Sequence, residues 1–140
     1  MVNTVMIPNS DITIYNKYFV NRAEVYQRAE LTAVVWQSTD AISRAKEQVA
    51  ANSALIMIPF AYGANYLKPK AWQALADKTG YWTLQEGDVI VRNIVADEID
   101  TEYTISNLRA DYDEVVTIHA IAAMDEGSPN MKHWELNCKW

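Results

Sequence analysis

The histidines and the single cysteine are the candidates for a metal site: His119, His133 and Cys138. In "KHWELNCKW", a regular strand places His133 and Cys138 on opposite faces, because they differ in parity, so one tetrahedral metal site cannot use both. His119 alternates with Thr117 on the less apolar face of "VVTIHAIA". We therefore expect it to face solvent or to be hydrogen-bonded, and we predict neither a metal site nor a cofactor.

Carboxylates are concentrated in one segment. Between Asp97 and Glu114 seven acidic residues stand beside Arg109 alone, which accounts for the net charge of −6. Paired carboxylates carry out glycoside hydrolysis, but so dense a run is ordinarily a solvated loop and helix edge. The calcium-loop pattern lacks its glycine. No cluster of Lys and Arg is present, so we do not predict a nucleic-acid binder.

The chain has only four glycines, and they form neither a G-x-S-x-G elbow nor a phosphate-binding loop. We therefore predict that the protein is not an enzyme. Most of the tryptophans lie in expected strands and are best explained as core or sheet-face residues: Trp36, Trp82, Trp134 and Trp140. Tyr62 and Tyr66 lie in the expected loop "AYGANYL" and have no obvious partners. Such aromatics mark either a protein interface or a platform for a sugar.

The elements that position these residues are mainly strands. Runs rich in Val, Ile, Tyr, Thr and Trp predict strands over 11–20, 24–37, 54–60, 81–84, 89–95, 114–124 and 132–140. Residues 81–95 predict a β-hairpin with Gly87 in its loop. Short helices are expected within 68–80, beginning at Pro69 and closed by Gly80, and within 104–112. Residues 38–52 predict either a helix or a long excursion between strands.

Half of the residues are hydrophobic, so the chain is long and apolar enough to bury a core. We predict one domain over 1–140, with 1–10 as an N-terminal arm. The fold class is mainly β: a small antiparallel β-barrel or sandwich with one or two short helices and long loops. The single cysteine fits a reducing cytoplasm, and no apolar window approaches the about 18 residues of a membrane span.

Several stretches resemble a family of small structural proteins of tailed phages and prophages of Gram-positive bacteria. They are "DITIYNKY", "EVYQR", "IPF", "YLKPKAWQALADKTGYWTLQEGDVIVRNIVADEI" and "DYDEVVTI" through "MDEGSPNMKHWEL". They cover most of the chain from Asp11 onward. The central block is the specific one, because Lys, Pro, Trp and Gly follow in a fixed order between two expected strands.

The resemblance implies a non-enzymatic, stopper-like head-to-tail connector of a long-tailed phage. Such neck proteins form rings, here expected with six or twelve copies. The ring would meet the portal or adaptor protein above and the tail terminator or tail tube protein below. DNA would be present only as channel contents, and no membrane is involved. The expected location is the head–tail interface of the virion, after assembly in the host cytoplasm.

This hypothesis assigns roles to residues in loops and at the C-terminus. The interface candidates are Tyr62, Asn65, Tyr66 and Trp140, and the expected contact loops are 40–53, 61–67 and 125–130. The candidates for the channel lining are Asp97, Glu98, Asp100 and Glu102, since an acidic wall repels phosphates and lets DNA slide. A solvated loop remains the alternative for these acids. Alternatives for function are a tail terminator or tail completion protein and, from another class, a carbohydrate-binding β-sandwich.

Overall fold

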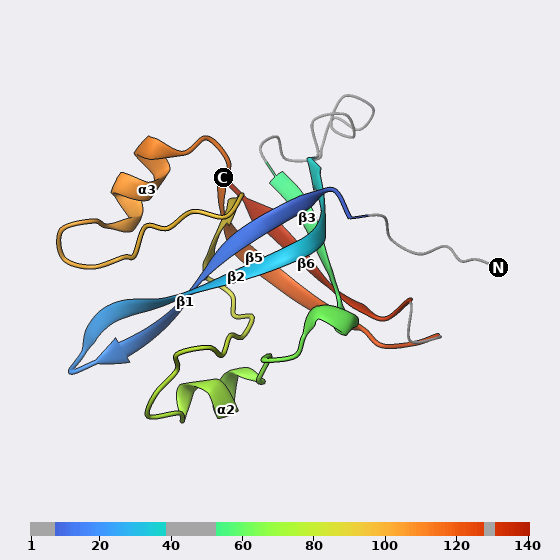
Figure 1. Cartoon of the computed structure of the whole chain (residues 1–140), viewed down its shortest axis with the longest axis horizontal. Helices are drawn as coiled ribbons and strands as arrows, with labels where there is room; N and C mark the ends of the chain where they lie inside the picture. The colour runs from blue at the N-terminus through green and yellow to red at the C-terminus, as the bar shows by residue number, and fades with distance from the viewer. Residues whose placement is uncertain (1–7, 39–52, 128–130) are drawn as a thin grey trace.

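The computed structural model describes residues 8–38, 53–127 and 131–140, and in them the chain is mainly β, as expected (Figure 1). The elements are β1 (Ser10–Val20), β2 (Ala23–Ser38), β3 (Ser53–Pro59), the 3-10 turn η1 (Phe60–Tyr62), α2 (Pro69–Gln73), β4 (Val89–Arg92), α3 (Ile105–Asp111), β5 (Val115–Met124) and β6 (His133–Lys139). The helix or excursion predicted over 38–52 lies outside the described residues, apart from Ser38 at the end of β2. Most of the expected arm 1–10 does too, although Ser10 already begins β1.

The strands close into an antiparallel barrel in the order β1-β2-β3-β6-β5-β4. β1 and β2 pair from Ile12↔Leu31 to Val20↔Ala23, and β4 completes the barrel between β1 and β5. Of the two architectures that the sequence left open, the chain therefore adopts the barrel.

Two clusters of buried side chains hold the barrel together. The inner cluster includes Ile12, Ile14, Ile56, Ile58, Ile90, Ile118 and Leu136, each at most 1% exposed. Full burial of such a side chain contributes roughly 1.5–3 kcal/mol. The second cluster lies where α3 covers the outside of the barrel, and its buried members are Tyr15, Val89, Val91, Val95, Leu108 and Val115. Leu108 is the buried residue of α3 and anchors this helix.

The prediction of a β-hairpin over 81–95 is wrong. β4 pairs with β1 and β5, whereas Trp82 makes only an isolated parallel bridge to Tyr66. The backbone of Thr83 bonds to a side chain instead: its N–H donates to Asn16 Oδ1 at 3.1 Å, and its carbonyl accepts from Asn16 Nδ2 at 2.8 Å. Because the amide of Asn16 occupies these groups, residues 81–84 need no partner strand.

Both short helices that the structure describes begin where the sequence predicts. Pro69 occupies the first position of α2, but this helix ends at Gln73, before Leu75 and well before Gly80. The side chain of Thr104 caps α3, accepting from Asn107 N–H while the Asn107 side chain accepts from Thr104 N–H. This reciprocal capping box explains why so short a helix is well defined.

The last strand alternates as expected up to its end. Trp134, Leu136 and Cys138 are buried in the barrel. Trp140, which the sequence suggested as a core or sheet-face residue, lies beyond β6 and is 42% exposed, so it is not part of the core. Its indole N–H donates to the Asp113 carbonyl at 3.2 Å, and its ring meets that of Trp36 edge-on at 6.4 Å.

Two strand pairs extend beyond the closed barrel. β1 pairs with β4 only over Ile12–Tyr15, so the β1–β2 hairpin continues past the barrel to its turn. Likewise β5 pairs with β4 only over Val115–Thr117, and its remainder pairs with β6 alone. The strand order places β2 and β5 three positions apart among six, on opposite sides of the barrel. The two ends point to opposite sides in Figure 1.

Candidate functional site

The residues considered for metal binding do not come together. His119 is exposed at a register shift between β5 and β6, whereas Cys138 is buried, and burial raises the pKa of its thiol to about 12. His133 Nε2 lies 3.0 Å from Glu135 Oε2. Across residues 8–38, 53–127 and 131–140, no three His, Cys, Asp or Glu side chains are grouped so as to hold a metal ion. In the same ranges, no helix has the length and apolar character of a membrane span.

Hydrogen bonds from tyrosines hold the acidic segment 97–114 against the barrel. The Asp97 carboxylate accepts from the Tyr112 hydroxyl at 2.6 Å, and its carbonyl accepts from the Tyr15 hydroxyl at 2.7 Å. Burial raises the pKa of Tyr15 to about 12, so this hydroxyl remains a donor throughout the physiological range. The hydrogen bond to Asp97 likewise raises the pKa of Tyr112. Asp97 is therefore a half-buried anchor of this segment.

The other three channel-lining candidates differ in role. Asp100 is exposed, but its carboxylate accepts from the N–H groups of Glu102 and Tyr103, both at 2.8 Å, and so shapes the turn before α3. Glu98 and Glu102 are exposed, and neither side chain bonds to another described residue. Of the four candidates, these two are therefore the ones whose charged side chains face solvent and take part in no hydrogen bond among the described residues that shapes the local fold.

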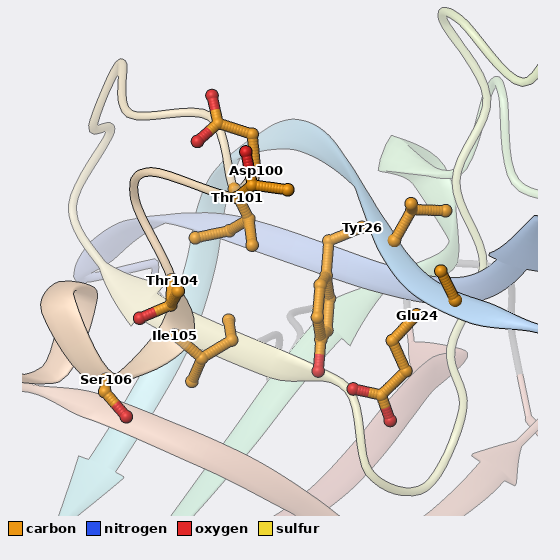
Figure 2. A pocket seen from close by; sticks show the side chains of 10 residues that line it. Glu24, Tyr26, Asp100, Thr101, Thr104, Ile105 and Ser106 are labelled. Carbon is orange, nitrogen blue, oxygen red and sulfur yellow. The ribbon is translucent and has the colours of Figure 1, made fainter.

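A groove separates the start of β2 from the segment that leads into α3. Its volume is about 590 Å³, and its lining residues are Ala23, Glu24, Val25, Tyr26, Ile99, Asp100, Thr101, Thr104, Ile105 and Ser106. We call it the hairpin–α3 groove. Figure 2 shows the ring of Tyr26 standing between the two walls, with Ile105 across from it. Tyr26, Ile99 and Ile105 are half-buried against the second core cluster, so the interior is apolar, while Glu24 and Asp100 supply acidic groups at its rim.

A buried polar cluster fixes the root of the β1–β2 hairpin. Asp88 is fully buried, and its carboxylate accepts from Asn16 Nδ2 at 2.8 Å, Lys17 N–H at 3.0 Å and Gln85 Nε2 at 3.0 Å. Burial raises the pKa of Asp88, and the hydrogen bonds from its three partners oppose that increase. The hairpin thus leaves the barrel from a rigid base.

The interface candidates occupy different environments. Tyr66 is half-buried, with its ring centroid 4.5 Å from that of Trp134 and 5.1 Å from that of Trp82. Asn65 is exposed and lines a hollow beside β2. The Tyr62 side chain lies outside the described part of the chain. Trp140 is exposed beyond the end of β6, beside Trp36 and Asp113, whereas Tyr66 packs on Trp134 at the start of β6, so these residues do not form one described surface.

The sequence analysis did not predict the exposed apolar residues at the ends of the two projecting strand pairs. Phe19 and Val20 are 61% and 48% exposed beside the β1–β2 turn. Met124 and Met131 are 42% and 52% exposed where β5 ends and β6 is about to begin. The signal was available in "YFVNR", where an apolar run continues to a polar two-residue turn, but strand patterns alone do not indicate where the core ends.

The comparisons add a family without an assigned activity. The model of a family described as "Family of unknown function (DUF6751)" matches residues 7–139. Searches of the curated proteins and of the solved structures find no match.

Proposed function

The chain belongs to the family of unknown function DUF6751, and we propose that it is a non-enzymatic connector protein of a phage neck. In this proposal it forms a stopper-like ring between the portal or adaptor and the tail, and helps to retain and pass DNA. The proposal combines the sequence resemblance with one structural observation. Exposed apolar side chains, Phe19 with Val20 and Met124 with Met131, mark the ends of two strand pairs on opposite sides of a closed barrel.

This arrangement supports a role in assembly. A closed barrel satisfies its own strand edges and makes a rigid scaffold, so the projecting parts are the surfaces left for neighbours. Exposed large apolar side chains at defined projections are typical of protein–protein contacts. A subunit of a ring needs contacts on two sides, and a neck ring needs further contacts above and below.

Electron microscopy of intact particles tests the proposal directly. Virions of the phage or induced prophage that encodes this chain would be imaged, with the chain located by fitting or by a label. We expect a ring of density between portal and tail that accommodates the barrel. Absence of the chain from purified particles would refute the connector function. A position at the end of the tail tube would instead support the tail terminator alternative, which the barrel alone does not separate from a stopper.

The structure also sharpens the test of an acidic channel wall. Asp97 and Asp100 hold the local fold, so reversing their charge would disturb structure as well as potential. Glu98→Lys with Glu102→Lys changes the charge of exposed side chains alone. If these residues line the channel, the double variant should slow DNA ejection, with Glu86→Lys, an exposed site outside the expected contact loops, as the control. Unchanged ejection kinetics would remove the lining role but not the connector function.

The carbohydrate-binding alternative depended on Tyr62 and Tyr66 as a stacking platform. Because Tyr66 packs against two tryptophans, a sugar would meet a ring that is already engaged. Binding to a glycan array that is lost in Tyr66→Ala and kept in Tyr81→Ala, an exposed tyrosine elsewhere, would favour this alternative.

A further inference from the structure

The outer edge of β2 near the hairpin turn has no strand beside it. Asn21 and Arg22 both have positive φ, 50° and 70°, so they form a type I′ turn between Val20 and Ala23. In a hairpin with this turn, Val20 and Ala23 are a hydrogen-bonded pair, and the pattern then alternates along the strands. The backbone N–H and C=O groups of Glu24, Tyr26 and Arg28 therefore point away from β1.

Contacts on the other strand confirm this alternation. Lys17 is paired with Tyr26, and its N–H and carbonyl bond outward, to Asp88 Oδ1 at 3.0 Å and to Gln73 Nε2 at 3.0 Å. On β1 the outward groups are thus satisfied by neighbouring side chains. On β2 the equivalent backbone groups of Glu24, Tyr26 and Arg28 bond to no other described residue. β3 pairs with β2 only from Val35 onward, so this stretch of the edge is open.

The part of the open edge nearest the hairpin turn lies in the hairpin–α3 groove. Residues 23–26 form one wall, and residues 99–106 form the other, with Ile99 and Ile105 as apolar contacts (Figure 2). A strand edge inside an apolar groove is the arrangement that binds an extended segment: main-chain hydrogen bonds supply affinity, and alternate side chains enter the groove. The site therefore fits a β-strand with small or apolar side chains.

The chain itself carries such a strand on the opposite side of the barrel. Beyond Ile118, β5 pairs only with β6, and Ala120, Ala122, Ala123 and Met124 are exposed. Natural edge strands are usually protected by charged side chains or proline, and residues 120–124 contain neither. Three alanines in five residues leave room for the strand to lie between β2 and α3.

We propose that copies of this chain join through these two edges: the β5 edge of one copy, Ala120–Met124, adds to the β2 edge of the next, Glu24–Arg28, whose first half, Glu24–Tyr26, lines the hairpin–α3 groove. The inference rests on the proposed function, because it names the contact that would build the ring. Since β2 and β5 lie on opposite sides of the barrel, the contact is head-to-tail. Each copy uses its second edge for another neighbour, and a suitable rotation closes the series into a ring.

Cysteine cross-linking of the purified full chain tests this contact. Facing residues of neighbouring strands have Cβ atoms about 4.5–5.5 Å apart, close to the separation that a disulfide spans. Glu24→Cys would be combined with Ala120→Cys, Ala122→Cys or Met124→Cys, which sample three registers. Under mild oxidation, at least one double variant should give a ladder of dimers, trimers and higher species on non-reducing gels. The wild type should give none, because Cys138 is buried.

The pattern of products identifies the type of contact. Glu24→Cys and Ala122→Cys as separate variants should not cross-link alone, but mixed they should give dimers and nothing larger. A double variant that stops at dimers would indicate a two-fold contact and overturn the head-to-tail proposal. Glu86→Cys with Ala122→Cys is the matched control, because Glu86 is exposed outside the groove; it should give no ladder.

Sedimentation provides a readout that needs no disulfide. The wild type should self-associate as its concentration rises to about 1 mM, where a contact with a Kd of that size is half formed. Ala122→Lys places a charge on the β5 edge and should leave the chain monomeric, whereas Asn137→Lys, an exposed site on β6, should not. A monomeric wild type together with absent ladders in all three registers would overturn the proposal.

The two proposals fail separately. A ladder from a chain that is absent from particles would refute the connector function and keep the edge contact. A neck ring seen by microscopy, with no cross-linking in any register, would keep the function and refute this contact.

Discussion

Asn16→Ala should remove a large part of the stability of the fold, because Asn16 ties the root of the β1–β2 hairpin to two other segments. Its amide donates to the Thr83 carbonyl and to Asp88 Oδ2, both at 2.8 Å, and accepts from Thr83 N–H at 3.1 Å. Asn16, Thr83 and Asp88 are all fully buried. Alanine leaves the N–H and the carbonyl of Thr83 without these bonds in a place that excludes water, and Asp88 Oδ2 keeps only the bond from Gln85 Nε2.

The magnitude follows from the three lost bonds. A neutral hydrogen bond contributes about 1 kcal/mol net, one to a charged group about 1.5–3 kcal/mol, and unsatisfied buried partners increase the cost. We therefore expect the free energy of unfolding to fall by about 4 kcal/mol. That is a large share of the 5–15 kcal/mol typical of a domain, and corresponds to a Tm lower by roughly 12 °C.

Urea unfolding followed by tryptophan fluorescence measures this change, with Asn137→Ala as the matched control. Asn137 is exposed on β6 and bonds to no other described side chain, so its replacement should change the free energy of unfolding by less than about 0.5 kcal/mol. If the loss in Asn16→Ala were as small as in this control, the buried amide would not support the hairpin and the reasoning would be refuted.

The pH dependence gives a second check on the same variant. Burial raises the folded-state pKa of Asp88, so its stabilising contribution is present below the unfolded value of about 3.9 and is lost as pH rises through the folded pKa. The Asn16 amide lowers that pKa, and removing it lets the pKa rise further. The deficit of Asn16→Ala relative to wild type should therefore grow between about pH 4 and pH 7. A deficit that shrinks over this range would contradict the assignment.

Three further experiments test other parts of the structure. Cys138 should not react with a thiol reagent in the native protein and should react fully in urea, because burial raises its pKa to about 12; rapid native labelling would contradict this. Tyr15→Phe removes the 2.7 Å hydrogen bond to the Asp97 carbonyl, so the free energy of unfolding should fall by about 1.5 kcal/mol. Amide hydrogen exchange should also become faster in residues 96–112, and unchanged exchange rates there would contradict the role of this hydrogen bond. Arg22→Gly should stabilise the hairpin by about 0.5–1 kcal/mol in urea unfolding, since Arg22 has φ 70°, and a loss of stability would show that its side chain contributes more than its backbone strain costs.

The strands were predictable where side chains alternate over a core. In β6, Trp134, Leu136 and Cys138 follow the period of two that a half-buried strand imposes, and all three are buried. The start of α2 was predictable because Pro69 is a local signal, and the cap at Thr104, which was not predicted, is a signal of the same local kind. These signals act over a few residues, so a single sequence contains them.

The predicted hairpin failed for a reason that a sequence does not contain. Tyr81–Leu84 have the composition of a strand, yet the backbone of Thr83 bonds to a side chain 67 residues earlier in the chain. When a side chain bonds to backbone groups that would otherwise pair with a strand, the sequence shows no periodicity and no fixed spacing that reveals it. The same holds for the hairpin–α3 groove, whose apolar contacts Tyr26, Ile99 and Ile105 come from segments that only the closed barrel brings together.

In the proposed assembly, the barrel and its open edges together would make the contact between copies specific. Closing the barrel satisfies most strand edges, yet the β2 edge and the β5 edge extend past it without a neighbouring strand in the described chain. Open edges favour uncontrolled association unless something selects the partner. In the proposed contact the hairpin–α3 groove would do so, because Ile99 and Ile105 give its second wall an apolar surface that favours apolar side chains. In the proposed assembly the buried Asn16–Asp88 cluster would have a functional consequence, because a hairpin held at its root would present one register and one direction to the next copy.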